Sequence, residues 1–170
     1  VLNGGTPVEM DPWLTNAAAL VETWYSGQMG GDAIANILFG KVNPSGKATF
    51  TFPKKLEDNP SFGNYPGADG VVHYKEGVFV GYRYYDTKNV EPLFPFGHGL
   101  SYTTFAYSGL KAAIDSVSFT VRNTGKRAGA EIAQVYAGLP AAANEPPKRL
   151  VAWEKLQLAP GESKTVTVKL

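Results

Sequence analysis

The 170-residue sequence has no cysteine, no long apolar run and no charge bias. The lack of thiols excludes disulfides, thiolate metal sites and a cysteine nucleophile, but it fixes no compartment, because a protein with a sizeable core needs no disulfides. A membrane-spanning helix needs roughly 20 successive apolar residues, so none is expected. With a formal net charge of +1 and basic residues scattered singly or in pairs, the sequence predicts neither a nucleic-acid nor a membrane partner.

Histidine is also scarce, with only His73 and His98 present. Neither has carboxylates nearby at ligand spacing, so no metal site is predicted. Ser101 lies in G-L-S-Y rather than in G-x-S-x-G, which disfavours a serine hydrolase. The glycine-rich residues 27–31 precede a helical pattern but lack the spacing of a phosphate-binding loop, so nucleotide binding is not expected. We therefore predict no cofactor.

Residues 1–70 alternate between strand and helix signals. They predict a strand over residues 1–8, a short helix with Asp11 as its N-cap, an amphipathic helix over residues 29–39 and a strand over residues 48–52. This succession is typical of an α/β fold with a mainly parallel sheet, of which the sequence contains part.

The last part of the chain follows a period of two. Val117, Phe119 and Val121 alternate with polar residues, which predicts a strand with one buried face. Two further alternating segments lie at residues 132–137 and 164–170. The turn signals are Asn123-Thr124-Gly125-Lys126, expected to form a hairpin-like turn, and Pro160-Gly161-Glu162. Short alternating strands separated by turns predict an immunoglobulin- or fibronectin III-like β-sandwich.

An aromatic-rich segment, residues 71–104, joins these two parts. Within it, residues 94–102 read F-P-F-G-H-G-L-S-Y, and the proline and glycines exclude a continuous helix. We expect a rigid, packed connector. The predicted fold class is thus α/β plus all-β, with an open α/β sheet layer over 1–70, a connector over 71–104 and a β-sandwich over 105–170.

The connector resembles a signature of family 3 glycoside hydrolases of the β-glucosidase type. Y-x-E-G-x-x-V-G-Y-R-Y-Y-D runs over residues 74–86, and P-L-F-P-F-G-x-G-L-S-Y-T-x-F runs over residues 92–105. Similar motifs occur at residues 24–28, where Ser26 replaces the family's usual proline, and at 31–40, 43–47 and 123–136. The resemblance covers essentially the whole chain. It implies the end of an α/β-sandwich domain followed by a fibronectin type III-like domain that is cut short at Leu170.

The same resemblance implies part of a retaining β-glucosidase that hydrolyses terminal β-D-glucosyl residues of glucosides and cello-oligosaccharides. Such an enzyme needs two carboxyl groups about 5–5.5 Å apart. In the family, the nucleophile lies on a (β/α)8 barrel and the acid/base on a loop upstream of residue 1. We therefore expect no catalytic carboxylate in this chain, inactivity of the chain alone, the missing barrel as its partner, and a parent enzyme that is secreted or periplasmic.

Two carboxylates, Glu76 and Asp86, flank the aromatic cluster and are the fallback catalytic pair. The preferred alternative is structural, with Arg83 pairing with one of them. His73, Tyr74 and Tyr82 are candidates for contacting a sugar substrate, since aromatic rings can stack on sugars.

Glu9 stands near a strand end, a common ligand position in α/β sheets. It is expected instead to serve the helix entry near Asp11.

Two further hypotheses remain open. One is a non-catalytic carbohydrate-contacting or scaffold module, and the other is a minimal enzyme that uses Glu76 with Asp86 or another carboxylate. In either case, open sheet edges and apolar faces predict self-association of the isolated chain.

Overall fold

The computed structural model describes every residue, Val1–Leu170. The chain forms two compact units that interleave along the sequence. The first comprises Val1–Gly30, Ala48–His98 and Gly138–Arg149, and the second comprises Gly31–Lys47, Gly99–Ala137 and Leu150–Leu170. The predicted domain boundaries after residues 70 and 104 remain predictions.

Short helices and extended segments build the first unit. The helices are α1 (Asp11–Leu14), α3 (Tyr82–Lys88) and the single 3-10 turns η1 (Leu56–Asp58) and η2 (Ala141–Ala143). Asp11 is the first helical residue of α1, not its N-cap as predicted, and Met10 takes the cap position. A carboxylate in the first turn still faces the positive end of the helix dipole. Helix α3 was not predicted, because its tyrosine-rich sequence has strand propensity.

Strand pairing in this unit is limited to isolated bridges. Leu2 pairs in parallel with Glu22, as an α/β layer requires, whereas Phe52 pairs antiparallel with Phe94. The antiparallel contact continues to Ala48, whose amide donates to the carbonyl of His98 at 2.7 Å. The predicted strand over residues 48–52 bends at residues 49–50 and forms no continuous ladder. Its partner segment contains prolines, which lack the N–H that a ladder needs.

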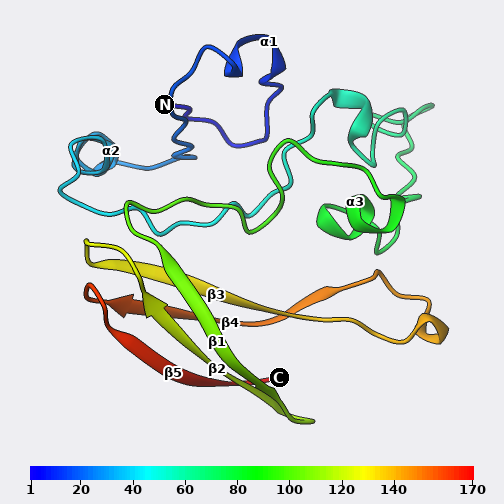
Figure 1. Ribbon diagram of the computed structural model, residues 1–170. Coiled ribbons are helices and arrows are strands. Elements are labelled where there is room, and N and C mark those ends of the chain that lie inside the picture. The colour runs from blue at the N-terminus through cyan, green and yellow to red at the C-terminus, as the bar shows by residue number, and fades with distance from the viewer. The chain divides into compact units, whose positions relative to one another are not determined.

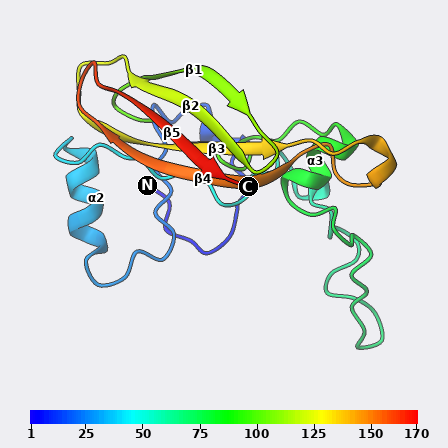
Figure 2. The same cartoon turned by 90° about the horizontal axis from the view of Figure 1, so that it is seen from below.

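Buried apolar side chains and ring contacts hold the first unit. Met10, Phe52 and Tyr85 are buried. The ring of Phe52 meets that of Phe94 edge to face at 6.1 Å, and that of Trp24 at 6.0 Å. The segment between η1 and α3 projects from the unit as a long loop (Figure 2).

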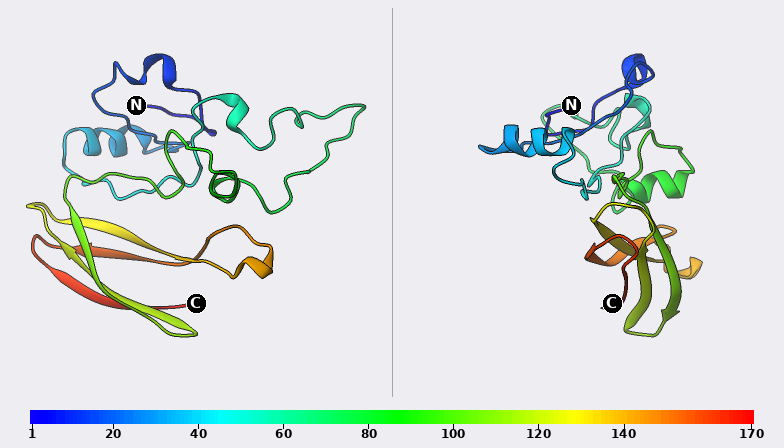
Figure 3. Two further views of the ribbon diagram at one scale, coloured as in Figure 1. Left: turned by 45° about the vertical axis from the view of Figure 1, so that its right-hand side comes forward. Right: turned by 60° about the vertical axis from the view of Figure 1, so that its left-hand side comes forward.

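The second unit contains the β-sandwich and most of helix α2 (Gly30–Leu38), close to the predicted 29–39. Its strands are β1 (Phe105–Ala112), β2 (Ser116–Asn123), β3 (Gly129–Ala137), β4 (Arg149–Leu158) and β5 (Ser163–Lys169). One sheet has the antiparallel order β1-β2-β5, and the other pairs β3 with β4. Figures 1 and 3 show the two sheets as facing layers.

The sandwich core arises from the predicted alternation. Val117, Phe119 and Val121 of β2 are buried, and β5 places Val168 opposite Val117. Ala133 from β3 and Leu156 and Leu158 from β4 complete the same core cluster from the other sheet. The predicted open sheet layer and β-sandwich are confirmed. The turn after β2 differs, since it leads from one sheet to the other and closes no hairpin.

No helix of the chain combines the length and the apolar character that crossing a bilayer requires.

Candidate functional site

The aromatic connector is packed through its rings, as expected. His98 stacks on Phe94 with ring centroids 5.3 Å apart, and Tyr82 lies 5.0 Å from Phe96. Tyr85 is buried in α3 and meets Tyr84 edge to face. Burial, with smaller contributions from Asp58 and Tyr84, raises the pKa of Tyr85 to about 12.

The three predicted sugar-contacting residues lie in different surroundings. His73 and Tyr74 are exposed on the projecting loop, and Tyr74 keeps 87% of its surface accessible. Tyr82 begins α3 and is half-buried against Phe96. Tyr74 is thus free to stack on a ligand, whereas one face of Tyr82 is used in packing.

The fallback carboxylates have separate partners. Glu76 accepts a hydrogen bond from Asn64 Nδ2 at 3.2 Å. Asp86 lies 3.2 Å from Lys148 Nζ. Arg83 pairs with neither and instead stands over the ring of Tyr82. The expected pairing with Arg83 is therefore wrong. The cation next to Asp86 is Lys148, which is distant in sequence.

Glu9 accepts the backbone N–H of Leu56 at 2.5 Å, so it holds the start of η1 rather than that of α1.

An open pocket of about 510 Å³ lies at the C-terminal end of α3. It is lined by Tyr85, Asp86, Asn89, Val90, Glu91, Pro147 and Lys148. Asn89 adopts a left-handed conformation, which ends the helix and turns the chain along the pocket. Sequence reasoning found Asp86 but missed the other polar groups. An asparagine that follows a helical segment could have indicated Asn89 as the residue that ends the helix. No feature of the sequence near Lys148 indicates that it lies beside α3.

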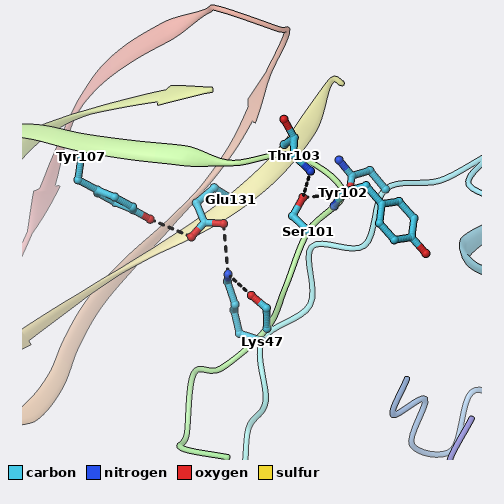
Figure 4. Close-up of polar contacts among 8 residues, drawn as sticks. Lys47, Ser101, Tyr102, Thr103, Tyr107 and Glu131 are labelled. Carbon is cyan, nitrogen blue, oxygen red and sulfur yellow. Dashed lines mark hydrogen bonds and ion pairs between the residues drawn. The ribbon is translucent and has the colours of Figure 1, made fainter. Parts of the chain in front are cut away.

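A second polar cluster lies within the sandwich unit (Figure 4). Lys47 Nζ is 3.2 Å from Glu131 Oε2 and donates to the carbonyl of Gly99 at 2.9 Å. The hydroxyl of Tyr107 donates to Glu131 Oε1 at 2.9 Å. Partial burial and the neighbouring Glu131 carboxylate raise the pKa of Tyr107. This cluster orients the turn that carries Lys47, and it contains no group poised for chemistry.

Asn43 supports the same turn. Its Oδ1 accepts from Ser101 Oγ at 2.9 Å and from the Tyr102 amide at 2.8 Å, and its Nδ2 donates to the carbonyl of Ala128 at 3.0 Å. A Cβ on Gly129 would stand 2.6 Å from Asn43 Nδ2, so the close approach requires glycine. The resemblance at residues 43–47 rests on the sequence N-P-S-G-K alone, whereas the partners that anchor Asn43 lie far along the chain.

No group of three or more histidine, aspartate or glutamate side chains is placed to hold a metal ion.

The fold and these motifs define the chain as a glycosidase-type α/β region with a fibronectin-like sandwich. The model of the glycosyl hydrolase family 3 C-terminal domain matches residues 1–102, and that of the fibronectin type III-like domain matches residues 131–170. The chain belongs to glycosyl hydrolase family 3.

Several relatives match over the full chain. Thermostable beta-glucosidase B of Acetivibrio thermocellus is 52% identical over 179 residues, which cover 100% of this chain and 24% of the relative. A beta-glucosidase of Rhizobium radiobacter is 47% identical over 100% of this chain and 22% of its own length. This chain thus spans about a quarter of the length of these relatives.

Solved structures of beta-glucosidases are similar to this chain. Beta-glucosidase 3B of Thermotoga neapolitana, solved in complex with glucose, has a TM-score of 0.94 at 42% identity, covering 99% of this chain and 25% of that protein. Beta-glucosidase of Kluyveromyces marxianus, also in complex with glucose, has a TM-score of 0.91 at 48% identity, covering 99% of this chain and 21% of that protein.

Proposed function

We propose that this chain acts as the C-terminal part of a retaining β-glucosidase that removes terminal β-D-glucosyl residues from glucosides or cello-oligosaccharides. The observation that carries the proposal is the match over the full chain, at 52% identity, to a thermostable beta-glucosidase. The similarity to beta-glucosidase 3B in complex with glucose supports the same substrate class.

The catalytic carboxylates of that enzyme lie outside this chain, the nucleophile on a barrel domain that is its partner and the acid/base on a loop upstream of residue 1. A retaining pair stands about 5–5.5 Å apart and must be free to attack and to transfer a proton. Glu76 is bound by Asn64 and Asp86 is paired with Lys148, so each carboxylate already has a structural role. In the whole enzyme, His73, Tyr74 and Tyr82 are the residues of this chain that contact the sugar.

A chimera tests the proposal. The quarter of the Acetivibrio thermocellus enzyme that matches this chain is replaced by it, and hydrolysis of an aryl β-glucoside is measured. We expect turnover by the chimera and none by the 170-residue chain alone or by the relative without its matching quarter. A folded chimera without turnover argues against the proposal. Turnover by the 170-residue chain, lost in Glu76→Gln, would place the catalytic centre within this chain.

A further inference from the structure

The pocket at the end of α3 carries balanced charge. Asp86 is paired with Lys148 at 3.2 Å, and Glu91 is paired with Lys54 at 2.5 Å. Each carboxylate of the lining therefore has its own ammonium partner. An anionic ligand would meet the carboxylates of these pairs and a cationic ligand their ammonium groups, whereas a neutral ligand meets no like charge.

The lining is polar and offers both kinds of hydrogen-bonding group. Carboxylates only accept hydrogen bonds, an ammonium only donates them, and the Asn89 amide does both. Hydroxyl groups match such a mixed lining, because each one donates and accepts. Oδ2 of Asp86 is shielded from solvent and accepts no hydrogen bond, so its contact with Lys148 is electrostatic.

The size of the pocket fits a small molecule. Its volume of about 510 Å³ falls in the range of roughly 300–1,000 Å³ that is typical of small-molecule sites. Tyr85, which is 4% exposed, forms part of the lining. Because the Tyr85 ring is buried, a ligand cannot stack on it. Binding of the ligand would rest on hydrogen bonds and on contact with Pro147.

From this geometry we infer that the pocket formed by Asp86, Asn89, Glu91, Pro147 and Lys148 binds a neutral polyhydroxyl compound of monosaccharide size. This binding is separate from turnover, since no bond is made or broken in it. It is also separate from the exposed Tyr74 on the projecting loop.

The test is a titration of the isotope-labelled 170-residue chain with D-glucose, followed by amide chemical shifts. We expect saturable shifts at the backbone amides of Asn89, Val90 and Lys148. Gluconate, which carries similar hydroxyls and one negative charge, should bind more weakly. Saturable shifts confined to residues outside the pocket, no saturable shifts at all, or gluconate binding equal to that of glucose would each overturn the inference.

Two substitutions probe the lining. Asn89→Gly removes the amide and keeps the left-handed backbone, and Asp86→Asn removes one charge at constant shape. Loss of one hydrogen bond that a hydroxyl makes to a charged group weakens binding about tenfold or more, so we expect that change for Asp86→Asn and a smaller one for Asn89→Gly. Glu154→Gln, at an exposed carboxylate on β4, is the matched control and should bind glucose as the parent does. If the Asp86→Asn variant does not fold, the test rests on Asn89→Gly. A folded Asn89→Gly variant that binds glucose with unchanged affinity contradicts the inference.

Discussion

Lys47 and Glu131 form the most enclosed ion pair of the chain, with Nζ and Oε2 3.2 Å apart and side-chain exposures of 16% and 12%. The pair joins the turn after α2 to strand β3. The other carboxylate oxygen of Glu131 accepts a hydrogen bond from the Tyr107 hydroxyl, and the Lys47 ammonium also donates to the carbonyl of Gly99. Both ions thus have the additional hydrogen bonds that a shielded pair needs in order to offset its desolvation.

Replacing Lys47 by methionine should lower the free energy of unfolding by about 2–4 kcal/mol, because it leaves a shielded carboxylate without its counter-ion. Urea denaturation measures the change. In the double variant Lys47→Met with Glu131→Leu, much of the loss should be recovered.

Lys164→Met is the matched control, since Lys164 and Glu162 form an exposed pair. Such pairs contribute about 1 kcal/mol or less. A Lys47→Met variant as stable as the control would show that the turn is held by Asn43 alone.

Asn123, at the end of β2, should be the most sensitive polar residue of the sandwich. It is fully buried, and its amide donates to the carbonyls of Arg127 and Leu158 while its oxygen accepts from Thr103 Oγ1 and the Gly125 amide. Asn123→Ala leaves these groups unsatisfied, so we expect a loss of about 2–4 kcal/mol in the free energy of unfolding. Thr124→Ala, at an exposed neighbour, should change it by less than about 1 kcal/mol. Similar stabilities for the two variants would contradict this role.

Local patterns predicted local structure well and long-range partners poorly. The alternation around Phe119 and the helical spacing over residues 29–39 are direct consequences of side-chain geometry, and both elements appear as expected. The ion pair of Asp86 with Lys148 could not be predicted, because it depends on how a distant loop returns to α3. Arg83 lies three residues before Asp86 in the sequence, yet it stands over the ring of Tyr82 instead.

Tyr85 should make stability depend on alkaline pH. Its pKa is about 12 in the folded chain, raised chiefly by burial, against about 10 for an unfolded tyrosine. Above pH 10 the unfolded chain loses this proton while the folded chain keeps it. Stability is therefore complete below pH 10 and falls as the pH rises towards 12. Unfolding midpoints measured across that window should fall less steeply in Tyr85→Phe than in the parent, and equal slopes would exclude this tyrosine as the cause.

The isolated chain should self-associate. Its two sheets contain only three and two strands, so each leaves edge strands unpaired, and large apolar side chains such as Phe39 (83% exposed) and Trp153 (65% exposed) face solvent. Unpaired edges and exposed apolar groups favour contacts between copies. Light scattering should report a mass above 18.3 kDa that rises with concentration. Trp153→Lys should lower this mass more than Gln157→Lys, which adds the same charge to β4 without removing an apolar group. A monodisperse monomer in the parent would contradict the prediction, and equal effects of the two variants would attribute any change to charge rather than to the Trp153 surface.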